Sequence, residues 1–202
     1  VLQERTDLSP EKAEKLAITA LTNAGLKIKD AEKGTDALFF ISASQVQALA
    51  RLVIDDEKDK KAYKEALKEN PSVDMIMFGR MAASDPSLNY DATVQVAHSI
   101  STHIVHNEYD YFTAVDDCSR DDNAGAGHLG TVEFNSAVLY RYVTVNVREL
   151  ANFTGEKAAR ATRNFVESFV YTMPTGKENT FANRTLPSDI YITLRRDQPV
   201  NL

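Results

Sequence analysis

The sequence lacks most of the features that mark secreted, membrane and disulfide-stabilised proteins. It has a single cysteine, Cys118, in 202 residues, so an internal disulfide cannot form and a reducing cytoplasm is the expected setting. No apolar run reaches the ~18 residues of a membrane span, and the polar start at Gln3, Glu4 and Arg5 is unlike a signal peptide. We therefore expect a cytoplasmic protein with no membrane partner.

Short motifs of common catalytic sites are also missing. The sequence has no GxSxG elbow, no HExxH helix, no paired cysteines and no phosphate-binding GxxxxGK[ST] loop. Each of these motifs supplies a nucleophile, a metal or a phosphate cradle that the corresponding reaction needs. The sequence therefore predicts no catalytic residue, no metal and no cofactor, and favours a protein that is not an enzyme.

An excess of basic residues is absent as well. The chain has 23 Lys and Arg against 29 Asp and Glu, which gives a formal net charge of -6. Proteins that bind nucleic acid use Lys and Arg to replace the counterions of the phosphates. The overall charge therefore argues against binding nucleic acid through the surface as a whole.

The first 70 residues have the pattern of a helical domain. Ser9 and Pro10 form a helix start, and apolar residues follow at helical spacing until Gly25. After a charged turn and the apolar run 37–41, a second amphipathic helix carries the residues between Val46 and Val53, and a third, mostly charged helix spans 57–69. These three helices predict a first domain at residues 1–70.

From Val73 onward the pattern favours alternating strands and helices. The expected elements are a strand at 73–78, a helix with Ala92, Val96, Ile100 and His103 on one face, an irregular segment at 107–135, a strand at 137–147, a helix capped by Thr154 that passes Phe165 and Phe169 and ends before Pro174, and a strand at 189–195. With one strand missing at the start, this order fits an antiparallel sheet with helices on one face. The predicted fold is therefore α+β, of the ferredoxin-like or RNA-recognition type.

Four phrases in the second half occur in a distinctive order. They are FGRMAAS at 78–84, AHSISTH at 97–103, YFTAVDD at 111–117, and AGHLGTVEFNSAVLYRYVTVNV at 126–147. In this order they resemble the CasC family of the Cas seven group, the backbone subunit of the type I-E CRISPR Cascade complex. Family members have further sequence on both sides, so the resemblance implies an internal fragment that lacks both termini.

The resemblance implies a fold and a function for the whole chain. It implies an RRM-like palm at 71–202 with a protruding thumb at 107–135, and assigns residues 1–70 to a helical fingers domain. The implied protein is a non-catalytic, antiviral CRISPR RNA-binding subunit that assembles head-to-tail into a helical filament. Its implied partners are CRISPR RNA, target DNA, neighbouring copies of itself and other Cascade subunits. Much of the family's basic character lies in a segment before Val1, which reconciles the acidic charge with RNA binding.

The predicted RNA-binding residues combine exposed apolar side chains with cations, because bases stack on apolar surfaces while cations follow the phosphates. The resemblance places Phe112, Leu129 and Met81 around a flipped-out base of the guide. The other predicted residues are Tyr111 and His128 beside them, and Arg80 and Arg141, which could pair with phosphate or with the acidic thumb.

Two other functions are open at this point. The carboxylates and imidazoles of one region could bind a divalent cation and make the protein a metal-dependent RNA hydrolase. The residues concerned are Asp110, Asp116, Asp117, Asp121, Asp122, His103, His106 and His128. Against this, aspartate is common in loops, and His98 and His103 fall inside the predicted helix, where burial is expected. A third possibility is a thumb that contacts only proteins.

Overall fold

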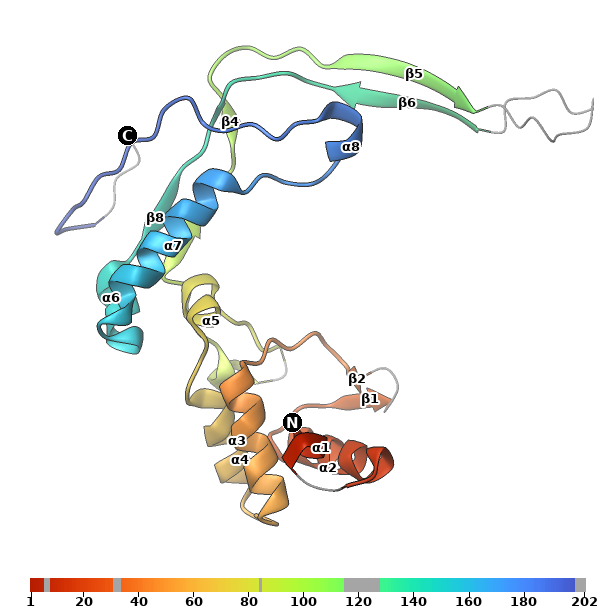
Figure 1. Cartoon of the computed structure of the whole chain (residues 1–202), viewed down its shortest axis with the longest axis vertical. Helices are drawn as coiled ribbons and strands as arrows, with labels where there is room; N and C mark the ends of the chain where they lie inside the picture. The colour runs from red at the N-terminus through yellow and green to blue at the C-terminus, as the bar shows by residue number, and fades with distance from the viewer. Residues whose placement is uncertain (6–7, 31–33, 84, 115–127, 199–202) are drawn as a thin grey trace, which may run out of the picture. The chain divides into compact units, whose positions relative to one another are not determined.

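The computed structural model of the protein describes residues 1–5, 8–30, 34–83, 85–114 and 128–198 (Figure 1). The chain divides into two compact units. The first consists of Val1–Gln95 and Thr144–Val200, and the second lies within Val96–Val143. None of the described helices is long and apolar enough to cross a membrane. Helices and short strands occur together, so the predicted α+β class is confirmed at this level.

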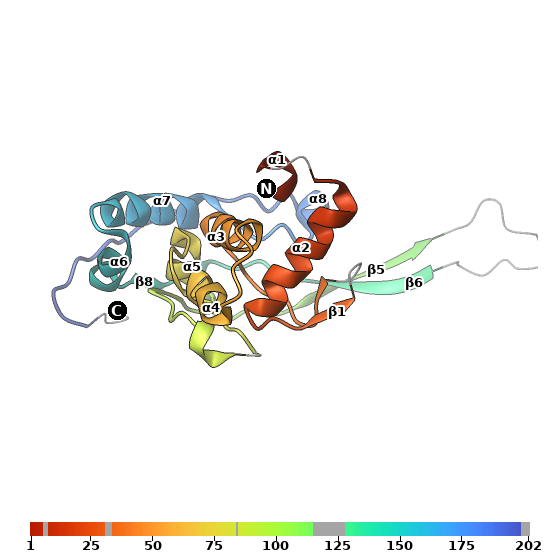
Figure 2. The ribbon, with the colours of Figure 1, turned by 90° about the horizontal axis from the view of Figure 1, so that it is seen from below.

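The predicted helices of the first 70 residues are confirmed. They are α2 (Pro10–Asn23), α3 (Ala43–Ile54) and α4 (Lys60–Lys68), preceded by the short α1 (Leu2–Arg5). Their starts are encoded locally. Ser42 and Gln45 form a reciprocal capping box on α3, and the Asp59 carboxylate accepts a hydrogen bond from a backbone N–H of α4. Figure 2 shows these helices from a second direction.

The helices enclose one apolar core. Tyr63 and Leu67 of α4 are fully buried together with Leu49 of α3 and Ala24 at the end of α2. Leu88, in the short helix η1 (Pro86–Leu88), belongs to the same cluster. A two-stranded antiparallel ladder of β1 (Ile28–Asp30) and β2 (Gly34–Thr35) follows α2.

The strand predicted at residues 73–78 is wrong, because the segment forms the helix α5 (Val73–Phe78). Met75, Ile76 and Met77 are all buried. An apolar run that is buried on every side carries no period, so its sequence does not separate a strand from a buried helix. The helix ends at Gly79, whose φ of 79° belongs to the region that favours glycine.

The helix predicted around residues 92–103 is also wrong. The segment contains β3 (Val94–Val96) and β4 (Ile100–Ser101), which pair with β8 (Val143–Val145) and β7 (Leu139–Tyr140). The predicted long strand at 137–147 is therefore two short strands. Ala92, Val96 and Ile100 are spaced by four, which places them on one side of a helix but equally on one side of a strand. Their β-branched neighbours favour the strand.

The C-terminal third contains α6 (Val147–Thr154), α7 (Lys157–Tyr171) and α8 (Glu178–Phe181). The helix through Phe165 and Phe169 is confirmed, and it ends before Pro174. Thr154 is not its cap: it ends α6, and its hydroxyl donates a hydrogen bond to the Leu150 carbonyl. The strand predicted at 189–195 does not form, since no described segment pairs with it and its apolar side chains are exposed.

The predicted irregular segment at 107–135 is instead a β-hairpin where the structure describes it. It pairs β5 (Glu108–Ala114) with β6 (His128–Phe134) in antiparallel register. The glycine-rich tip predicted at 121–127 lies outside the described residues, as do Cys118, Asp116 and Asp117. The described strands make four separate two-stranded sheets in place of one continuous sheet.

Candidate nucleic-acid interface

The register of the β5–β6 hairpin decides which predicted RNA contacts share a face. Phe112 lies opposite Gly130, and Thr113 lies opposite Leu129. Directly paired residues point to the same side of a sheet, and successive residues point to opposite sides. Phe112 and Leu129 are therefore on opposite faces of the hairpin and do not form one surface. The predicted grouping of these two side chains around a single base is not what the hairpin presents.

One face of the hairpin carries three large exposed side chains. Tyr109, Tyr111 and Leu129 are 66%, 63% and 60% exposed, and the register places all three on the same face. A two-stranded hairpin has no second layer to cover such side chains. Apolar groups that are left exposed together mark a surface that binds a ligand or a neighbour.

The opposite face carries the Phe112 ring. A Cβ added to Gly130 would lie 2.6 Å from the Cζ atom of Phe112, so the ring lies directly over the glycine. Val132 and Phe134 share this face with Phe112, as do the carboxylates of Glu108 and Asp110. Phe112 is 39% exposed. This face is therefore apolar and acidic.

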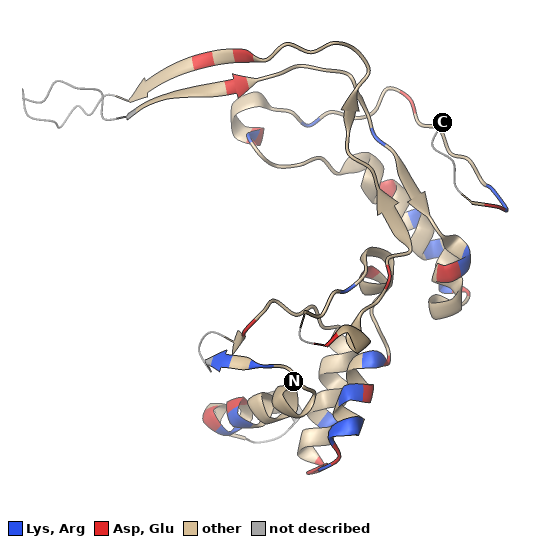
Figure 3. Ribbon diagram, turned by 180° about the vertical axis from the view of Figure 1, so that it is seen from behind, with Lys and Arg blue, Asp and Glu red and all other residues tan. Residues whose placement is uncertain are grey.

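Neither described strand of the hairpin contains Lys or Arg. Figure 3 shows acidic residues on both strands and no basic ones. His128 is the first residue of β6, opposite Ala114. The hairpin can thus offer apolar contacts to bases, but its strands have no permanent cation for a phosphate.

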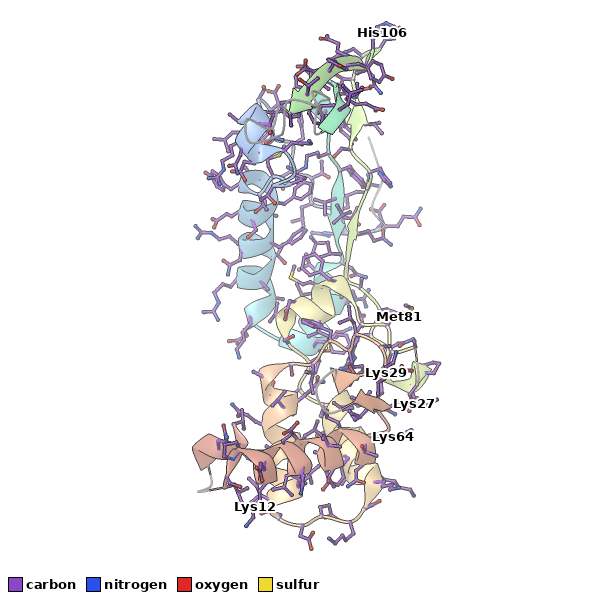
Figure 4. The ribbon with its side chains drawn as sticks, turned by 90° about the vertical axis from the view of Figure 1, so that its right-hand side faces the viewer. Lys12, Lys27, Lys29, Lys64, Met81 and His106 are labelled. Carbon is purple, nitrogen blue, oxygen red and sulfur yellow. The ribbon has the colours of Figure 1, made fainter. Side chains whose placement is uncertain are left out.

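Met81 is the predicted contact that the structure exposes most clearly. It follows Arg80, whose backbone pairs with Tyr90 in an isolated antiparallel bridge. The Met81 side chain is 79% exposed, although methionine usually fills gaps in a core. Figure 4 shows Met81 on one side of the first unit. Its exposure fits the predicted contact with a base.

Arg80 is in a different position from the one predicted. Its side chain is only 4% exposed. The guanidinium donates hydrogen bonds to the carbonyls of Leu67, Leu88 and Phe40 at 2.8, 2.9 and 3.3 Å, and to Oε1 of Gln45 at 3.2 Å. Burial lowers the pKa of Arg80.

The Arg80 guanidinium also lies 4.8 Å from the ring centroid of Phe39 and 5.0 Å from that of Tyr90. A cation over an aromatic face is attracted to its electrons. The side chain therefore joins the segment before α3, the end of α4 and η1, and the structure supports this role in place of the predicted contact with phosphate or with the acidic thumb. Arg141 lies between β7 and β8 and is partly buried.

The residues of the proposed metal site are not brought together where the structure describes them. No group of three or more potential ligands forms within residues 1–5, 8–30, 34–83, 85–114 and 128–198. The predicted burial of His98 and His103 is wrong, because both are exposed. Nε2 of His103 accepts the N–H of Val138 at 3.1 Å, and its Nδ1 lies 2.9 Å from the Ile104 carbonyl. Asp116, Asp117, Asp121 and Asp122 lie outside the described residues.

Two lysines near Met81 were missed by the sequence analysis. Lys27 and Lys29 are exposed, whereas Ile28 between them is partly buried. Figure 4 shows both lysines on the same side of the first unit as Lys64 and Met81. The available signal is the alternation of lysine and isoleucine at Lys27, Ile28 and Lys29, in a segment that the sequence predicts to be a charged turn.

Lys64 has an ionic partner in Asp85, with 2.5 Å between Nζ and Oδ2. The hydrogen bond from Lys64, followed by those from Ser87, lowers the pKa of Asp85 to about 2. We expect Lys64→Met to raise this pKa towards the usual 3.8 without reaching it, because the Ser87 contacts stay. Carboxyl ¹³C NMR titration measures the change, and an unaltered midpoint would contradict the assignment.

The lowered pKa of Asp85 also determines how the free energy of unfolding changes with pH. The folded pKa of Asp85 lies below its unfolded value, so the carboxylate contributes stability above about pH 4. That contribution is lost as the pH falls towards 2. Urea unfolding of the wild type should therefore depend on pH more steeply in this window than unfolding of Lys64→Met. The effect is small because the Lys64 side chain is 47% exposed, so that water screens the pair.

One family model and two solved chains are similar to this chain. The family model described as CT1975-like protein matches residues 1–202. No curated protein sequence matches the chain. A solved chain titled "CRISPR RNA-guided surveillance complex, pre-nicking" is 32% identical, with a TM-score of 0.78, and the match covers 99% of this chain and 61% of that one.

A second solved chain, titled "CRISPR RNA-guided surveillance complex", is 34% identical with a TM-score of 0.51. The match covers 74% of this chain and 53% of the other. The chain therefore spans less than two thirds of the length of either solved chain.

Proposed function

The chain belongs to the CT1975-like protein family, and on this basis we propose that it is part of a non-catalytic, CRISPR RNA-binding backbone subunit of a Cascade surveillance complex. The proposed subunit is of the CasC kind found in type I-E systems. It acts in the cytoplasm, assembles head-to-tail along the guide RNA and presents the guide for pairing with target DNA. Its other partners are neighbouring copies of itself and the remaining Cascade subunits.

The observation that carries the proposal is the β5–β6 hairpin, which exposes apolar side chains to different degrees on its two faces. Tyr111 and Leu129 are exposed on one face and Phe112 on the other. Such side chains suit contact with unpaired bases, which are held by stacking without regard to sequence. A 32% identity over 99% of the chain to part of an RNA-guided complex supports RNA as the ligand.

The proposed division of the parent protein follows the family. Residues 1–70 are the helical fingers, residues 71–202 belong to an RRM-like palm, and residues 107–135 form the thumb. The described hairpin lies within the thumb segment, and the compact unit at Val96–Val143 contains it. In this proposal sequence specificity comes from base pairing of the guide, while the protein holds the backbone and the base faces. Head-to-tail contacts between identical subunits produce an open helical assembly.

Co-purification of RNA with the full-length parent tests the proposal. We expect the full-length parent, co-expressed with its CRISPR array and the other Cascade subunits, to retain RNA of discrete length through affinity and gel-filtration steps. The same cells without the array provide the control. A protein that elutes alone and free of RNA would overturn the proposal.

The same preparation separates the hydrolase alternative. Incubation with Mg²⁺ or Mn²⁺ should leave the bound RNA intact. Metal-dependent cleavage that disappears in Asp116→Ala or Asp117→Ala would replace the proposed scaffold with a nuclease.

A further inference from the structure

The apolar hairpin leaves open which side chains meet the phosphates of a bound strand. Its described strands contain no Lys or Arg, and the Arg80 guanidinium is buried and hydrogen-bonded to protein acceptors. An RNA strand held only by stacking would keep its counterions and gain little from charge. Because the described strands supply no such cation, exposed lysines of other described segments are the candidates.

Lys27 and Lys29 are exposed cations of the first unit. Lys27 precedes β1, and its carbonyl accepts the N–H of Asp36 at 2.9 Å, which holds the backbone in the β1–β2 ladder. Neither lysine makes an ion pair with a residue that the structure describes. Two residues apart in an extended strand, they are separated by about 6–7 Å, which is comparable to the spacing of neighbouring phosphates in an extended single strand.

A chain of contacts links these lysines to the surface that exposes Met81. The Cε atom of Lys64 lies 3.4 Å from the position of a Cβ on Gly25, two residues before Lys27. The Nζ atom of Lys64 pairs with Asp85, and the backbone N–H of Asp85 donates to the Ala82 carbonyl at 3.3 Å. Lys64 thus connects the start of β1 to the segment that follows Met81.

Lys64 forms an ion pair with Asp85, whereas Lys27 and Lys29 form no ion pair with a described residue. Figure 4 shows Lys27, Lys29 and Met81 on one side of the first unit. Figure 3 shows blue on part of β1 and on the chain beside it. An exposed thioether and two cations on one side form the combination that contacts a base and the backbone of the same strand.

We propose that Lys27 and Lys29 bind two neighbouring phosphates of the single strand whose base contacts Met81. The inference rests on the proposed RNA-binding function and adds a specific phosphate subsite to it. The ligand chemistry is the phosphodiester backbone of a single strand, and guide RNA and target DNA are its two possible sources. We assign the subsite to the guide RNA, because the resemblance to the CasC family predicts that Met81 contacts a base of the guide.

The test is the salt dependence of RNA binding by the full-length parent. Each phosphate neutralised by a lysine contributes about -0.7 to the slope of log K against log salt for a single strand. The variant Lys27→Gln/Lys29→Gln should therefore show a slope less steep by about 1.4, and about tenfold weaker binding of guide RNA near physiological salt. Lys12→Gln/Lys15→Gln, which removes two exposed lysines of α2, is the matched control and should leave the slope unchanged.

The possible outcomes separate the two proposals. A wild-type parent that binds no guide RNA would overturn the proposed function itself. Wild-type binding with an unchanged slope in Lys27→Gln/Lys29→Gln would overturn only the phosphate subsite. If the RNA slope is unchanged but the RNA-loaded complex binds single-stranded target DNA with a smaller slope, the subsite belongs to the DNA strand and the assignment to guide RNA is wrong. Thermal unfolding of both double variants should match the wild type, because all four lysines are exposed.

Discussion

Replacing Arg80 by alanine is expected to destabilise the first unit by about 3 kcal/mol or more. The guanidinium of Arg80 donates to the buried carbonyls of Leu67 and Leu88 and to the side chain of Gln45. Alanine leaves these acceptors without their donor in a site that water does not readily enter. A buried polar group that loses its partner costs about 1–3 kcal/mol, and several lose theirs together.

Urea unfolding followed by far-ultraviolet circular dichroism measures the loss for Arg80→Ala. Arg51→Ala is the matched control, because Arg51 is an exposed arginine of α3 and its removal should change the unfolding free energy by less than about 0.5 kcal/mol. Arg80→Lys keeps the charge but not the planar fork, so we expect an intermediate loss. If Arg80→Ala unfolds with the same free energy as the wild type, the guanidinium does not hold these elements together.

The placement of Arg80 shows what the sequence could not predict. The sequence analysis leaves two partners open for Arg80, phosphate and the acidic thumb. The acceptors of its guanidinium come from three separate segments of the chain, which contain Phe40 with Gln45, Leu67 and Leu88. Their convergence depends on the packing of α3, α4 and η1, and no local pattern around residue 80 reports it.

Elements whose ends are encoded locally were predicted correctly. Pro10 at the first helical position marks the start of α2, and Ser42 with Gln45 caps the start of α3, because both signals depend on residues within one turn. Ser72 and Gly79 flank the segment at 73–78, but the sequence analysis does not use them, and the segment at 92–103 has no such marks. Their apolar residues fit a helix and a strand equally well, so the tertiary surroundings decided between the two.

The hairpin shows what a sequence can and cannot indicate about a site. The sequence analysis names Tyr111, Leu129 and Met81 as RNA contacts, and all three side chains are exposed. It could not supply the register of the hairpin. Phe112 pairs with Gly130 and Thr113 with Leu129, and a shift of one residue would move Phe112 and Leu129 onto a common face. The register therefore separates two contacts that the family resemblance had grouped.

Because Phe112 and Leu129 lie on opposite faces, mutations can remove the RNA contacts of each face separately or of both faces together. Replacing Tyr111, Phe112 and Leu129 together by alanine in the full-length parent should weaken guide RNA binding by about 30-fold or more, because each stacked base contributes about 1–3 kcal/mol. Fluorescence anisotropy with a labelled guide measures the affinity. Tyr191→Ala is the control, since Tyr191 is 88% exposed and lies outside the hairpin.

Variants of single faces then assign a role to each side of the hairpin. Tyr111→Ala/Leu129→Ala removes side chains from one face, and Phe112→Ala removes the ring from the other. If both faces contact bases, each variant should lose part of the affinity, and the two losses in free energy should add up to that of the triple variant. If one face contacts a neighbouring subunit, its variant should keep the RNA affinity but give a smaller particle in gel filtration. A triple variant that binds guide RNA as tightly as the wild type would restrict the hairpin to protein contacts.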